Sequence, residues 1–160
     1  MSTSIGGDRC LAGLLSEAGR SSSPDIEFCD TVMAQCLDAL PIMLWVTNAR
    51  GGITFHNRAA YQYHGPRLAL GTLPYERADL FHHEDFPLKN AARERVLRTG
   101  LDVRVNLRTI RYDYTPRWHA FHLTPLFGKA SMIMGLLIAM TDIHYQHDVP
   151  RPGGRKVSDV

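Results

Sequence analysis

The spacing of hydrophobic residues predicts a helix followed by a series of strands. Between residues 26 and 40, apolar side chains recur at every fourth position, which is typical of a helix with one apolar face, and Pro41 ends it. This face comprises Phe28, Val32, Cys36 and Leu40. Residues 101–111 alternate apolar and polar side chains, which predicts a half-buried strand. Residues 132–143 are apolar on both faces, which favours a central strand covered on both sides.

Two further strands are predicted close to the first helix. Residues 43–47 and 53–56 are short apolar segments, and the turn between them contains two glycines that supply positive φ angles. Asn57 follows directly and is a good N-cap for a short helix over residues 58–63.

Glycine and proline mark the ends of the remaining elements. Gly65 terminates the short helix. The clearest helix covers residues 88–99, with Pro87 suited to its first position and Gly100 to its C-terminal cap. A strand over residues 117–124 follows, ended by the next residue, a proline.

This order of elements predicts an α+β fold, with a single antiparallel sheet and helices gathered on one face. The expected organisation is a flexible tail at 1–25, a flanking helix at 26–40, one domain at 41–147 and a disordered tail at 148–160.

The composition is that of an ordinary globular domain. Hydrophobic residues make up 44% of the 160 residues, charged residues 21%, and the net charge is +2. Nucleic-acid binding is not expected, because it would require a basic stripe. The start shows no secretory signal, and no apolar run approaches the ~20 residues of a membrane-spanning helix, so no membrane association is expected. Three cysteines without a C-x-x-C motif, Cys10, Cys29 and Cys36, indicate a reducing, cytoplasmic location.

Four fragments of the chain resemble the PAS domain family of sensory modules. PIMLWVTNARGGITFHNRAAYQYHG (41–65) is similar to the family's first two strands and the helix that follows them. LFHHEDFP (80–87) resembles the entry to its main helix, although His83 and Phe86 replace the usual Pro and Arg. RWHAFHLTPL (117–126) and GLLIAMTDI (135–143) resemble its last two strands.

The resemblance implies a five-stranded antiparallel sheet curled around a small cavity that helices cover. PAS modules bind haem, flavin or small metabolites in this cavity, or bind nothing and serve as dimerisation modules. The expected function is therefore a sensory or regulatory module, not an enzyme, that binds a small ligand in an apolar pocket and signals through protein–protein contacts.

The alternation along the strands predicts which side chains face the cavity. They are Trp45, Thr47, Ile53, Phe55, Val105, Leu107, Thr109, His119, Phe121, Leu136, Ile138 and Met140. Alternatively, these side chains fill one another's space and leave no cavity.

The cofactor is left open by the sequence. The light-sensing branch of the family carries a flavin-bonding Cys before the main helix, and ERADLFHH (76–83) has none. Thr109, His119 and Met140 occupy positions where that branch places amides, which argues further against flavin. Haem is possible with His82, His83 or His119 as the iron ligand, although a capping role is favoured for His82.

His119 is the most informative candidate, because an inward imidazole in an apolar pocket needs a partner. Burial should lower its pKa, and the neutral ring could orient a carbonyl, a hydroxyl or a water. A rival hypothesis is a small cone-shaped isomerase or dehydratase with a His119–Asp113 pair. The order of helices and strands argues against that fold.

A homodimer is expected, because a strand apolar on both faces leaves surface that a monomer would expose. Its contact should involve the helix at 26–40 and the outward face of the sheet near Trp118 and Leu137. A signalling partner protein is expected as well, but nothing in the sequence identifies it.

Overall fold

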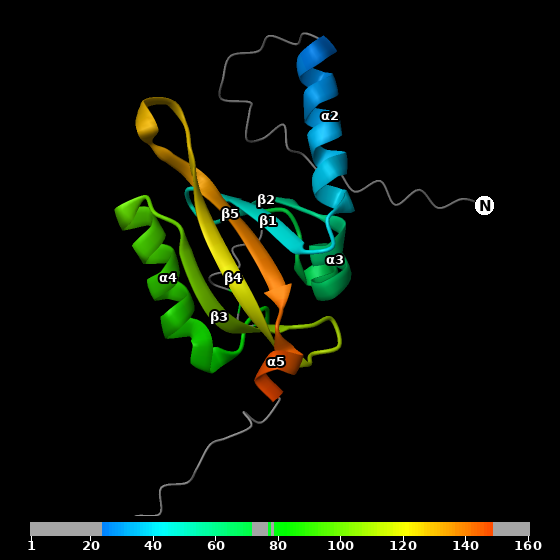
Figure 1. Cartoon of the computed structure of the whole chain (residues 1–160), viewed down its shortest axis with the longest axis vertical. Helices are drawn as coiled ribbons and strands as arrows, with labels where there is room; N and C mark the ends of the chain where they lie inside the picture. Colours follow the sequence, from blue (N-terminus) through cyan, green and yellow to red (C-terminus); the bar gives the residue numbers. More distant parts are fainter. Residues whose placement is uncertain (1–23, 72–76, 78, 149–160) are drawn as a thin grey trace, which may run out of the picture.

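The computed structural model describes residues 24–71, 77 and 79–148, which form one antiparallel sheet of five strands with helices against it (Figure 1). The helices are α2 (Pro24–Ala39), α3 (Arg58–His64), α4 (Phe86–Thr99) and α5 (His144–Asp148). The strands are β1 (Met43–Asn48), β2 (Ile53–His56), β3 (Val103–Ile110), β4 (Pro116–Phe127) and β5 (Ile133–Asp142). The predicted α+β fold is confirmed.

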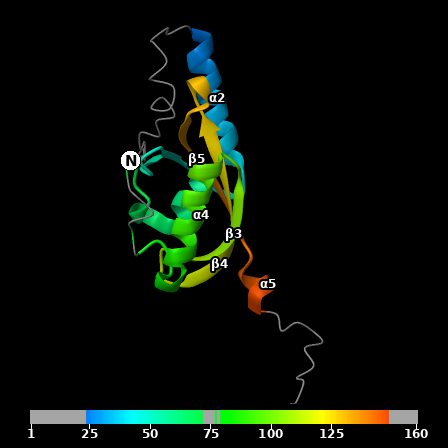
Figure 2. The same ribbon diagram turned by 90° about the vertical axis from the view of Figure 1, so that its left-hand side faces the viewer.

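The strands follow the order β2-β1-β5-β4-β3, so β5 lies at the centre as its apolar sequence predicts. Its register with both neighbours aligns the inward side chains: Ile138 pairs with Trp45 of β1, and Met140 pairs with Phe121 of β4. Helix α4 packs against β3 and β4 (Figure 2). The outward side chains Leu137 and Ala139 of β5 are only half-buried, so the described residues cover this face of the strand incompletely.

The ends of several elements differ from the sequence prediction. Helix α4 begins at Phe86, because a 3-10 turn over His83–Asp85 leads directly into it. Strand β4 runs through Pro125, which was expected to end it. The proline is tolerated because β3 pairs with β4 only as far as Leu123, and β4 is an edge on that side beyond this residue.

The predicted caps are confirmed. Gly65 and Gly100 end α3 and α4 with positive φ angles of 67° and 65°. Asn57 caps α3 and is fully buried. Its side chain accepts hydrogen bonds from the amides of Leu44 and Ala60, and donates to the carbonyls of Leu37 and Ile42. One side chain thus joins the end of α2, the start of β1 and the start of α3.

Helix α2 contacts the domain through its C-terminal end and otherwise rises away from α3 (Figure 1). Its predicted start at residue 26 lies two residues inside the observed one. Val32 and Met33 on this helix are exposed rather than packed on the sheet. The tails predicted at 1–25 and 148–160 fall almost entirely outside the described residues.

Candidate functional site

The predicted pocket residues face the interior of the domain, which confirms the inward assignment of the strands. Val105 is half-buried and the other members of the set are buried. They pack tightly, however, and the space between Trp45, Phe121 and the main helix is a void of about 10 Å³. Such a void holds about one water molecule. Among the described residues, the space between these side chains is therefore too small for a ligand.

A larger groove of about 370 Å³ opens beside this interior, at the end of the sheet. It lies between α3, the residues that lead into β1, the end of β5 and the loop from β3 to β4. Its lining residues are Pro41, Ile42, Met43, Ala59, Gln62, Tyr63, Arg111, Tyr112, His119, Met140, Thr141 and Asp142. Of the predicted set, the groove includes His119 and Met140.

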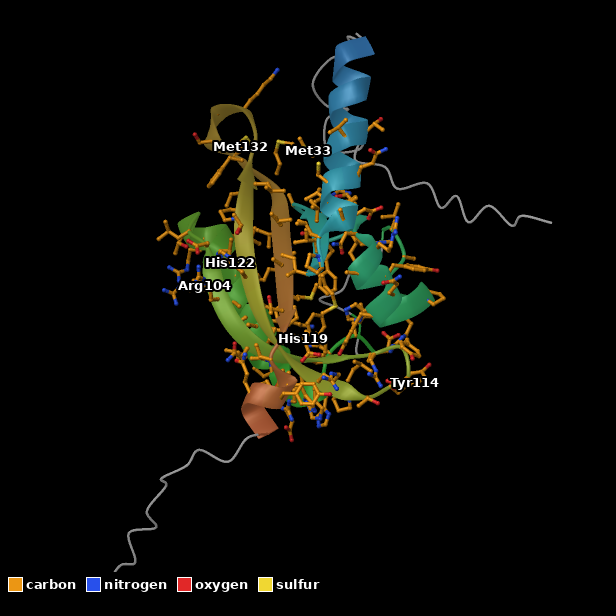
Figure 3. The ribbon with its side chains drawn as sticks, turned by 45° about the vertical axis from the view of Figure 1, so that its right-hand side comes forward. Met33, Arg104, Tyr114, His119, His122 and Met132 are labelled. Carbon is orange, nitrogen blue, oxygen red and sulfur yellow. The ribbon has the colours of Figure 1, made fainter. Side chains whose placement is uncertain are left out.

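His119 lies on β4 near one end of the sheet, and the turn with Met132 lies at the opposite end (Figure 3). The residue is fully buried, and its Nδ1 is 3.0 Å from the carbonyl oxygen of Arg117 and 3.0 Å from Oγ1 of Thr109. Because a carbonyl only accepts, the proton of the neutral ring belongs on Nδ1. Burial lowers the pKa of the His119 imidazole, as the sequence predicts. Its Nε2 has no hydrogen-bond partner among the described residues.

Tyr63 covers His119 from helix α3 and was not identified from the sequence. The two rings meet edge to face with centroids 4.9 Å apart. The Tyr63 oxygen accepts a hydrogen bond of 3.3 Å from Oγ1 of Thr109, and burial raises the pKa of its hydroxyl. The signal that could have found it is its spacing: Tyr63 follows Ala59 by one helical turn, so both share the face of α3 that lines the groove.

Charged residues at the rim of the groove are neutralised by neighbours. Arg111 pairs with Asp113, and Asp142 pairs with Arg117 at 3.0 Å. Asp113 therefore pairs with Arg111 and not with His119, so the His–Asp pair of the rival enzyme hypothesis does not form. The pairing with Arg111 also holds the pKa of the Asp113 carboxyl well below its usual range.

The interior holds further polar groups that sequence reasoning missed. Burial lowers the pKa of His64 to about 3, and its Nδ1 lies 3.2 Å from the carbonyl oxygen of Ile110. Lys89 from α4 is buried with its ammonium group 4.1 Å from the ring centre of Phe86, and desolvation lowers its pKa to about 8. Trp45 Nε1 and His64 Nε2 have no hydrogen-bond partner among the described residues.

The candidate iron ligands before the main helix have other roles. His82 is half-buried, and its Nδ1 accepts from the amide of Glu84 at 3.4 Å, so it caps the turn that leads into α4. His83 is exposed and stacks on His82. Within the described part of the chain, no three His, Cys, Asp or Glu side chains are placed to hold a metal ion.

No helix in the same part is long and apolar enough to cross a membrane.

A family model for the PAS fold matches residues 37–148. The chain belongs to the PAS family. This match confirms the resemblance of the four sequence fragments. The PAS domain is a sensory and signalling module. No curated protein matches the chain significantly.

Solved PAS structures share the fold at low sequence identity. The PAS domain of a protein from Colwellia psychrerythraea is 18% identical, with a TM-score of 0.64 over 73% of this chain and 98% of that one. The Rhodobacter sphaeroides light-oxygen-voltage (LOV) protein is 16% identical, with a TM-score of 0.59 over 76% and 69%. The PAS-B domain of Drosophila melanogaster Cycle, with bound ethylene glycol, is 19% identical, with a TM-score of 0.54 over 62% and 98%.

Proposed function

We propose that this PAS domain senses a small molecule that binds in the groove between α3 and the ends of β1 and β5. The observation that carries the proposal is the groove itself, because the buried His119 lies on its floor and is joined through Thr109 to Tyr63 on its wall. Small-molecule sites are concave and mostly apolar, with a few fixed polar groups. A volume of about 370 Å³ lies at the lower end of the range of small-molecule pockets.

Groove-blocking substitutions test this proposal. Ala59 is half-exposed on the groove wall, and Ala59→Trp should fill the groove without burying a polar group. Fragments that bind the wild type should lose at least about tenfold in affinity, equal to ~1.4 kcal/mol. Tyr61→Trp adds an indole to the same helix at an exposed position outside the groove and serves as control. Equal binding by wild type and Ala59→Trp, measured by protein-observed NMR, would contradict the proposal.

The groove fits a haem poorly. His119 Nε2 has no accessible surface, so an iron would reach it only if Tyr63 moved. His82 caps a turn, as described above. We therefore propose a module without haem or flavin, and an absorption spectrum of the protein mixed with haem should show no binding band.

The absence of a His119–Asp113 pair supports a non-enzymatic role. The odd number of cysteines supports a cytoplasmic location.

We propose a homodimer as the signalling unit, with α2 of one protomer on the outward sheet face of the other. Met33 is 55% exposed on α2, and Leu137 and Trp118 are half-buried on the outward face. Covering these surfaces with a second copy would remove apolar area from water. A signalling partner protein would then contact the dimer rather than the groove.

Light scattering tests the dimer. The wild type should have twice the monomer mass, and Met33→Glu should shift it toward monomer because a charge enters the apolar contact. Leu101→Glu changes an exposed apolar residue on the link from α4 to β3 and should leave the dimer intact. A wild-type monomer at high concentration would contradict the proposal.

A further inference from the structure

A chain of three polar side chains leads from the interior of the sheet to the wall of the groove. It begins at the carbonyl oxygen of Arg117 and continues through His119 and Thr109 to Tyr63, with steps of 3.0, 3.0 and 3.3 Å. His119 and Thr109 have no exposed surface, so solvent does not reach their part of the chain. The proton position of each group in the chain therefore limits where the next group can place its proton.

The direction of these hydrogen bonds follows from the fixed end. The carbonyl of Arg117 only accepts, which places the proton of the neutral His119 ring on Nδ1. Nδ1–H is then shared with Oγ1 of Thr109, and a nitrogen that carries a proton cannot accept from the threonine. The Thr109 proton is directed to the oxygen of Tyr63 instead. The O–H of Tyr63 is left as a donor at the end of the chain, on the wall of the groove.

The charged residues at the rim of the groove are paired with one another. Its two rim ion pairs, Arg111–Asp113 and Asp142–Arg117, present no unpaired charge of either sign. Met43 and Met140 contribute flexible thioethers to the lining, which suit an aromatic ring.

We infer that the groove takes an uncharged, ring-containing molecule that presents a hydrogen-bond acceptor, such as a ketone or amide oxygen, to the hydroxyl of Tyr63. This inference rests on the proposed groove site and specifies its ligand class. Tyr63 supplies selectivity for the acceptor, and the apolar walls bind the ring.

Acetophenone and ethylbenzene are matched probes, because they differ mainly in the carbonyl oxygen. In NMR titrations the wild type should bind acetophenone about threefold to tenfold more tightly than ethylbenzene, the usual contribution of one hydrogen bond. Tyr63→Phe should abolish this difference, because the variant has no hydroxyl to donate to the carbonyl. Benzoate and benzylamine, the charged counterparts, should bind more weakly than acetophenone.

The outcomes separate the two claims. Failure of both neutral probes to shift groove resonances would overturn the groove site itself. Equal binding of both probes, or a carbonyl preference that survives Tyr63→Phe, would overturn the ligand class alone. The ligand-free protein gives an independent reading: ¹⁵N spectra of His119 should show the proton on Nδ1, and a proton on Nε2 would reverse the chain and overturn the inference.

Discussion

Lowering the pH from 7 to about 4.5 is expected to destabilise the domain by about 2–3 kcal/mol through His64. The folded state holds the pKa of His64 near 3 against an ordinary value of 6.5, because burial disfavours the charged ring. The unfolded chain therefore binds a proton at a higher pH than the folded domain does. The free energy of unfolding decreases as the pH falls below 6.5, the pKa of the unfolded chain. His119 adds to the loss in the same direction.

Urea unfolding at several pH values measures this effect. The window between about pH 6.5 and 5 reports mainly on histidines, because the carboxylates of the unfolded chain titrate mostly below it. His64→Gln keeps a polar side chain but cannot ionise, so its stability should fall less over the same window. A wild type with equal stability at both ends of the window would show that His64 is not held neutral in the folded state.

Asn57→Ala is expected to lower the free energy of unfolding by about 3 kcal/mol. The substitution removes the cap of α3 and leaves the buried amide of Leu44 and the partly buried carbonyl of Ile42 without their partner. Asn57→Ser keeps an oxygen for the Ala60 amide and should recover about 1 kcal/mol.

Asn48→Ala is the matched control for this prediction. Asn48 is exposed, and its side-chain oxygen accepts from the Gly52 amide in the turn between β1 and β2. Its loss should cost less than about 1 kcal/mol. If thermal or denaturant unfolding gave similar losses for the two alanine variants, Asn57 would not be the junction of α2, β1 and α3 described here.

The elements of the fold were predictable where a residue acts locally. Asn57 and Gly100 mark a helix start and a helix end through their own side chain or backbone angle, and both predictions are confirmed. Pro125 misled the prediction, because its effect depends on how far the neighbouring strand extends. That is a property of the sheet and not of the nearby sequence.

The candidate site was predictable only in part. Alternation placed His119 correctly, because it depends on a single strand. The groove combines α3, the link into β1, the β3–β4 loop and the end of β5, and no local pattern predicts that these segments meet. Tyr63 was missed for this reason. The sequence left open whether the interior holds a cavity, because packing density depends on how side chains from several strands fit together.

Methionine methyl NMR tests the groove most directly. Met43 and Met140 line the groove, whereas Met33 is exposed on α2 and Met132 is exposed in the turn between β4 and β5, both far from His119 (Figure 3). With acetophenone added to protein labelled at the methionine methyl groups, the Met43 and Met140 signals should shift together and show contacts to the ring of the probe. The Met33 and Met132 signals should stay in place. Shifts confined to Met33 and Met132, or no shifts at any methionine, would contradict a ligand site in the groove.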